Sequence, residues 1–179
     1  MRYTIRPARS DEHAALGRIL VDAYQRLPGM PDARAQPAYY AMLADVAARA
    51  RNPAITVFAA VADDGALAGS VDFIADVAHY HSGADLRAFP GAAGIRLLAV
   101  DPAHRGAGLG RALTERCLDE ARARAQAAVV LHTTRAMATA WRLYERLGFR
   151  RHDAIDFQQG ELAVLGFVRL TEASPPTRL

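Results

Sequence analysis

The feature that most constrains this chain is a glycine-rich loop, Arg105–Gly110, that lies between an apolar segment and an amphipathic one. Gly94–Val100 predicts a strand that Asp101-Pro102 ends, and apolar residues recur at helical spacing from Leu109 to Ala121. The first amides of a helix are unpaired and carry partial positive charge, and glycines let the chain wrap closely around an anion. The loop therefore predicts a phosphate site at the edge of a sheet, although the glycines would also suit a simple turn.

The rest of the chain is predicted to form further strands and helices. Strands are expected at Tyr3–Pro7, Ile55–Val61, Leu67–Val77, Val129–Thr133 and Leu162–Leu170. Helices are expected at Ser10–Gln25, from Pro37 to before Pro53, at Leu109–Ala121 and at Met137–Leu147. This order predicts an α/β fold with a mixed, mostly antiparallel central sheet and helices on both faces. We expect a single domain over residues 1–170 and a flexible tail over 171–179, which has two prolines and little to bury.

Composition narrows the kinds of ligand. The chain has no lysine, which excludes a Walker-type NTP loop, and Arg111 stands where a dinucleotide fingerprint needs its third glycine. The arginines are interleaved with acidic residues, so no nucleic-acid partner is expected. Cys117 is the only cysteine and falls on the apolar face of its helix, so neither an intramolecular disulfide nor a bound metal is expected.

Targeting signals are not evident. No apolar run reaches the roughly 18 residues of a membrane span, and the first residues lack the apolar stretch of a secretory signal. We therefore expect a cytoplasmic protein with no membrane contact. A homodimer is compatible with the sequence but is not required by it.

The loop matches one further pattern, in which Arg105 is followed by Gly108 and Gly110. With Leu97–Pro102 before it and Ala140–Phe149 after it, the pattern resembles the GNAT acetyltransferase superfamily. The resemblance implies a GNAT-like acyltransferase fold with acetyl-CoA as the acyl donor. It implies that the backbone of Leu98, Ala99 and Val100 binds the pantetheine arm of the coenzyme. It implies that the pyrophosphate is bound by the loop residues Arg105, Gly106, Ala107, Gly108, Leu109, Gly110 and Arg111.

The resemblance also assigns Tyr144 and Met137. Tyr144 would contact the coenzyme and donate a proton to the departing thiolate, a role that suits an uncharged phenol. By helical spacing alone, Tyr144 would be read as a core tyrosine. Met137 stands where many relatives have an asparagine that contacts the cofactor arm, so that contact is made by the backbone or is absent.

The base is the least defined part of the predicted site. Where many relatives have a glutamate, this chain has Gly94, yet a protonated amine needs a proton acceptor before it can attack a thioester. His79 and His81, in the long connection over 78–92, are the first candidates, because histidine titrates near neutral pH; Asp85 and Tyr80 in the same connection are weaker ones. The alternative is that both are exposed loop histidines. His132, on an apolar strand, is interpreted as a core residue.

These features together predict an acetyl-CoA-dependent N-acetyltransferase. The expected acceptor is a small-molecule or peptide primary amine that attacks the thioester directly, with no covalent intermediate because Cys117 is expected to be buried. The alternative is a non-catalytic acyl-CoA-binding or regulatory module, since Gly94 and Met137 depart from the pattern.

Overall fold

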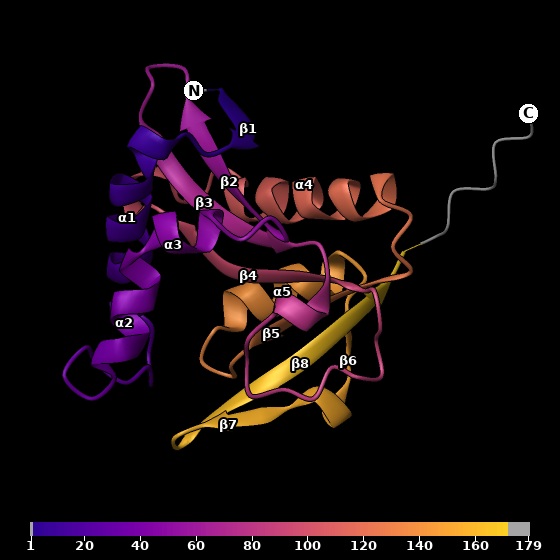
Figure 1. The fold of residues 1–179 in the computed structure, drawn as a ribbon. Helices are drawn as coiled ribbons and strands as arrows, with labels where there is room; N and C mark the ends of the chain where they lie inside the picture. The colour runs from indigo at the N-terminus through magenta and orange to yellow at the C-terminus, as the bar shows by residue number, and fades with distance from the viewer. Residues whose placement is uncertain (1, 172–179) are drawn as a thin grey trace, which may run out of the picture.

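A computed structural model describes residues 2–171 of the 179-residue chain (Figure 1). The strands are β1 (Tyr3–Pro7), β2 (Ile55–Ala62), β3 (Leu67–Ile74), β4 (Ala93–Val100), β5 (Ala128–Thr133), β6 (Arg150–Arg151), β7 (Phe157–Gln159) and β8 (Leu162–Leu170). The helices are α1 (His13–Gln25), α2 (Pro37–Ala44), α3 (Val46–Ala50), α4 (Leu109–Ala123) and α5 (Ala138–Arg146). Among these residues no helix combines the length and the apolarity needed to cross a membrane.

The strands form one eight-stranded sheet in the order β1-β2-β3-β4-β5-β8-β6, with β7 paired to β8. Within residues 2–171 the β4–β5 pair is parallel and the other pairs are antiparallel. A parallel pair needs a crossover, which α4 provides between β4 and β5. The prediction of a mixed, mostly antiparallel sheet is confirmed.

Helices cover both faces of the sheet, as predicted (Figure 1). On one face α1, α2 and α3 bury Leu16, Leu20 and Leu43 against β2 and β4. On the other face α4 and α5 pack on the sheet, and Cys117 is fully buried in that layer, as expected. The alternation of side chains along each strand supplies both cores.

Three element boundaries differ clearly from the prediction. The helix expected from Ser10 begins at His13, after a 3₁₀ turn over Ser10–Glu12. The helix expected from Pro37 is two helices, because Asp45 leaves helical geometry and its Oδ1 accepts a hydrogen bond from the Ala48 amide at 2.8 Å. The strand expected to reach Val77 ends at Ile74, because Asp76 Oδ1 accepts from the Ala78 amide at 2.8 Å and begins a short 3₁₀ turn. Asn and Asp side chains compete with regular structure in this way, which apolar patterning does not register.

The tail expected over 171–179 lies outside the described residues except for Thr171. Its amide donates to the Ala127 carbonyl oxygen at 3.0 Å, beside the start of β5.

Candidate functional site

The site begins where two neighbouring strands separate. β4 and β5 pair at Ala93–Ile95 and then diverge, although β4 continues to Val100. The register of β3 against β4 shifts between Ser70 and Asp72, beside Leu97, whose φ of +53° is unusual for a residue with a side chain. Such a bulge bends a strand and ends its pairing. The edge of β4 that faced β5 is therefore open beyond Ile95.

A cleft of about 790 Å³ occupies the space next to this open edge. Most residues predicted from the resemblance to hold the coenzyme line it: Leu98, Ala99, Val100, Arg105, Gly106, Gly108, Leu109, Gly110, Arg111 and Met137. Ala107 and Tyr144 are not among the lining residues. The sequence did not indicate the opposite wall, which comes from the end of α1 with Arg26–Pro28 and from α5 with Leu143 and Arg146.

The loop has the geometry that an anion requires. Gly106 and Gly108 have φ of +81° and +76°, and a Cβ atom on either would meet no atom within 4 Å. Both glycines are therefore used for backbone conformation, and the space above them is open. Gly108 is the N-cap of α4, so the first amides of that helix face the cleft without intrahelical partners. These amides and the positive end of α4 can hold phosphate oxygens.

Tyr144 lies in α5 and is 5% exposed, in the core formed with Cys117 and Phe149. Its ring packs on Phe149 with centroids 5.8 Å apart. Burial raises the pKa of Tyr144 well above its ordinary value, so the phenol keeps its proton at neutral pH. Tyr144 is thus a core residue, as helical spacing indicates, with a neutral phenol.

A second, smaller cavity of about 90 Å³ lies on the α1–α2 face of the separated strands. Its walls come from Tyr24 and Tyr39, from Tyr80 and Arg96, from His132–Thr134, and from Phe157 to Val164 at the β7–β8 hairpin. Met137 lines this cavity as well as the cleft, so the two spaces lie on either side of it. Burial raises the pKa of Tyr39 to about 12, so its hydroxyl is also neutral.

His132 and Tyr80 form a hydrogen-bonded pair in this cavity. His132 Nδ1 lies 3.0 Å from Tyr80 Oη, and His132 Nε2 lies 2.8 Å from the Ile155 carbonyl oxygen. Tyr80 Oη also lies 3.2 Å from the Ile95 carbonyl oxygen. Both ring nitrogens of His132 have hydrogen-bond partners, as expected of a core histidine. The ring is nevertheless only half-buried, and it lines the cavity. A polar residue alternating with Val130 near the end of β5 is the signal that could have indicated this.

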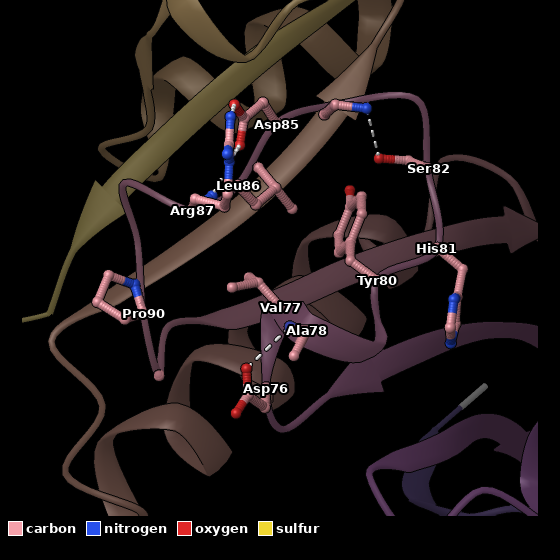
Figure 2. Close-up of a pocket in the computed structure, with 12 residues that line it drawn as sticks. Asp76, Val77, Ala78, Tyr80, His81, Ser82, Asp85, Leu86, Arg87 and Pro90 are labelled. Atoms are coloured by element: carbon pink, nitrogen blue, oxygen red, sulfur yellow. Dashed lines mark hydrogen bonds and ion pairs between the residues drawn. The ribbon is translucent and has the colours of Figure 1, made fainter.

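His79 and His81 lie elsewhere. Both are exposed, neither lines the small cavity, and their rings are 6.2 Å apart. His81 instead lines a hollow of about 630 Å³ enclosed by the segment from Asp76 to Gly91. Figure 2 shows the His81 side chain pointing away from the Tyr80 ring. Among residues 2–171, no three His, Cys, Asp or Glu side chains are grouped so that they could hold a metal ion.

The chain matches one protein-family model and short stretches of several characterised proteins. The model of the acetyltransferase (GNAT) family matches residues 10–149. A mycothiol acetyltransferase of Streptosporangium roseum is 48% identical over 59 residues, which are 33% of this chain and 18% of that protein. An N-acetylaspartate synthetase of Danio rerio is 44% identical over 57 residues, which are 32% of this chain and 20% of that protein. The match therefore spans a minor part of each of these relatives.

Solved structures show the same fold over nearly the whole chain. A GNAT-family acetyltransferase of Staphylococcus aureus Mu50 has a TM-score of 0.71 at 14% identity, covering 96% of this chain and all of the other. A Salmonella typhimurium protein solved with its cofactor acetyl-CoA has a TM-score of 0.64 at 22% identity, covering 99% of this chain and all of the other. At these identities the likeness is one of fold.

Proposed function

The chain belongs to the GNAT acetyltransferase family, and on that premise we propose that it transfers the acetyl group of acetyl-CoA to a primary amine by direct attack on the thioester. The observation that carries the proposal is the pair of spaces on either side of Met137. The larger one has the phosphate-type loop, and the smaller one has polar groups suited to an acceptor. Two reactants in these adjoining spaces would meet beside Met137, where β4 and β5 separate.

The donor side is held by backbone groups. The amides of the loop and of the start of α4 would bind the pyrophosphate, and Arg105 and Arg111 would add positive charge. The free edge of Leu98–Val100 would pair with the pantetheine arm, and its amides would polarise the thioester carbonyl. Acetyl-CoA supplies an activated acetyl group. The Salmonella typhimurium protein of the same fold, which was solved with acetyl-CoA, supports this assignment.

Tyr144 is proposed as the proton donor to the leaving group. The amine nitrogen bonds to the carbonyl carbon, the C–S bond breaks, and the thiolate takes the phenol proton. A covalent intermediate on Cys117 is not expected, because that thiol is fully buried and burial raises its pKa.

The acceptor is proposed from the lining of the small cavity. Aromatic rings of Tyr24, Tyr39 and Phe157 offer an apolar surface, and Arg96 brings a positive charge. No Asp or Glu lines this cavity in the part of the chain that the structure describes. The lining favours an amine with an apolar or acidic body over a polyamine, which would need carboxylates to hold its charges.

The amine must also lose a proton. His79 and His81 were predicted to receive it, but because neither lines the small cavity they can do so only through solvent. A cytoplasmic location and a homodimer stay predictions from the sequence alone.

The test is release of coenzyme A from acetyl-CoA with a panel of aromatic amines, amino acids and polyamines. Thermal stabilisation by acetyl-CoA is measured in parallel. Turnover with at least one amine supports the transferase. Stabilisation without turnover across the panel would instead support the non-catalytic acyl-CoA-binding module.

A further inference from the structure

The hydrogen bonds of His132 define where its protons are. The Ile155 carbonyl oxygen can only accept, so His132 Nε2 carries a hydrogen in either charge state. When the ring is neutral, Nδ1 has a lone pair, and the single Tyr80 hydroxyl hydrogen is donated either to Nδ1 or to the Ile95 carbonyl oxygen. When the ring is protonated, Nδ1 donates to Tyr80 Oη, and the Tyr80 hydroxyl donates to the Ile95 carbonyl oxygen. Both states therefore fit the same heavy-atom positions, and only hydrogens move.

The Tyr80 ring occupies space that is left by a glycine, Gly94. A Cβ atom on Gly94 would lie 2.4 Å from Tyr80 Cδ2 and 2.7 Å from Cε2. No side chain fits at position 94 while the ring is there. Tyr80 thus occupies the space over β4 beside Ile95, the last residue of β4 that pairs with β5.

His132 lies on the neighbouring strand, β5, close to the position of Ile95 on β4. It follows Leu131, the partner of Ile95, so it stands where the strands begin to diverge. Tyr80, His132 and Ile95 all line the small cavity. In the proposed reaction the amine nitrogen would occupy this cavity next to the separated strands.

The groups around His132 favour its neutral form, which has the lone pair that a proton acceptor needs. Burial is the largest effect and lowers the pKa of His132, and the charges of Arg96 and Arg151 lower it further. The hydrogen bond to the Ile155 carbonyl and the charge of Asp156 act in the opposite direction, with a smaller net effect. Arg96 faces the pair from β4, with its guanidinium 5.2 Å from the centroid of the Tyr80 ring.

We infer that Tyr80 and His132 form the proton relay that deprotonates the acceptor amine, with Tyr80 as the group that touches the amine and His132 as the terminal acceptor. The inference rests on the proposed N-acetyl transfer. The ammonium form of the amine gives one proton to Tyr80 Oη while the Tyr80 hydroxyl proton moves to His132 Nδ1. The freed lone pair forms the C–N bond, the C–S bond breaks, and the thiolate takes the Tyr144 proton. The second N–H proton returns to the Tyr144 phenolate through solvent, and His132 releases its proton to solvent.

The experiment compares pH profiles of kcat at saturating amine for the full-length wild type, His132→Gln and Tyr80→Phe. Glutamine can donate to the Ile155 carbonyl and accept from Tyr80, but it cannot take up a proton. We expect kcat at pH 7 to fall about 100-fold in both variants, the usual size for a lost acid–base group. We expect the acidic limb of the wild-type profile to disappear in His132→Gln, while the Kd for acetyl-CoA stays within about twofold.

The matched control is His152→Gln. His152 is also half-buried and packs on Phe89 with ring centroids 5.0 Å apart, but it lines neither cavity. The acidic limb of the pH profile of His152→Gln should match that of the wild type. An NMR titration of the wild-type imidazole nitrogens, repeated in Tyr80→Phe, gives a second measurement that needs no turnover. Loss of the Tyr80 hydroxyl should shift the titration midpoint of His132.

The outcomes separate this relay from the proposed function. Turnover in the wild type with an unchanged acidic limb in His132→Gln and in Tyr80→Phe would overturn the relay and leave the transferase in place. Loss of the limb in His79→Ala or His81→Ala, but not in His132→Gln, would also overturn it. A wild type that binds acetyl-CoA but acetylates no amine would overturn both proposals. If His132→Gln does not fold, Tyr80→Phe and the wild-type titration still decide, because an unshifted midpoint contradicts the relay.

Discussion

The Tyr80 ring lies so close to Gly94 that a Cβ atom at position 94 would be 2.4 Å from its Cδ2 atom. Contacts this short do not occur between real side chains, so the strand and the ring can coexist only because residue 94 is a glycine. The pair places the Tyr80 hydroxyl within hydrogen-bond distance of His132. A glycine in a strand, which usually weakens the sheet, here makes room for the Tyr80 ring.

Gly94→Ala should therefore lower the free energy of unfolding by about 1–3 kcal/mol, the usual cost of an overpacked core. Tyr80→Leu should relieve part of this cost, because it removes the ring that the new methyl group meets. Urea unfolding of both single variants and of the double variant measures the coupling, which we expect to be about 1 kcal/mol or more. Strictly additive losses would show that the two residues do not compete for the same space.

Gly106→Ala and Gly108→Ala should each weaken acetyl-CoA binding by about tenfold, equivalent to about 1.4 kcal/mol. Gly65→Ala is the matched control, because Gly65 also has a positive φ, of +88°, and also has open space at its Cβ position. All three changes should cost similar stability, since each forces a side chain into left-handed backbone. Calorimetric titration with acetyl-CoA should distinguish the loop variants from the control; equal affinities in all three would argue against the loop as the pyrophosphate site.

Tyr144→Phe should lower kcat by about 100-fold while leaving the Kd for acetyl-CoA nearly unchanged, because only the transferred proton is lost. The raised pKa of Tyr144 means that it stays protonated throughout the neutral range. Tyr40→Phe serves as the control, because Tyr40, like Tyr144, is buried and lines neither cavity, and its hydroxyl donates to the Pro31 carbonyl oxygen at 3.0 Å. Tyr144 follows Leu143, which lines the cleft, whereas none of the residues of α2 lines it. That variant should lose some stability and keep its kcat. Unchanged turnover in Tyr144→Phe would remove Tyr144 from the mechanism.

Asp72→Asn should destabilise the fold by about 3–5 kcal/mol, because it leaves the buried Arg49 charge without its partner. Arg49 Nε and Asp72 Oδ2 are 2.7 Å apart, with the Arg49 side chain 11% exposed and that of Asp72 2% exposed. Within residues 2–171, Arg49 Nη2 and Asp72 Oδ1 have no hydrogen-bond partner. The double variant Arg49→Met with Asp72→Leu should regain most of the loss, since no charge is then left buried. Chemical denaturation of the wild type and the two variants checks this, and a double variant less stable than Asp72→Asn would contradict it.

The stability of the fold should fall at acid pH through Glu12. Arg6 makes two hydrogen bonds to this carboxylate, at 2.5 and 2.9 Å, and lowers the pKa of Glu12 from 4.5 to about 2. A lowered pKa adds stability above the unfolded value of 4.5, and that stability is lost as pH falls toward about 2. The difference in unfolding free energy between wild type and Glu12→Gln should be about 1 kcal/mol at pH 6 and should shrink below pH 4.5. A difference that does not change between pH 6 and pH 2.5 would rule out this ion pair as the cause.

Local patterns predicted the parts of the site that one continuous segment builds. The strand Gly94–Val100, the loop and the start of α4 follow one another in the chain, so their apolar spacing and glycines define them without tertiary information. The same reasoning missed the break at Asp45 and the early end of β3 at Ile74. There a single carboxylate captures a backbone amide, and apolar periodicity contains no trace of it.

The sequence by itself determined the family resemblance, the mixed sheet and a loop shaped for phosphate, because these depend on residues close together in the chain. Only the tertiary structure decided which polar groups share the small cavity. Tyr80 and His132 are 52 positions apart, and they meet because β4 and β5 pair in parallel and because Gly94 leaves room for the ring. Strand pairing and close packing act between distant segments, so the predicted candidates His79 and His81, neighbours of Tyr80 in sequence, lie outside the cavity that Tyr80 lines.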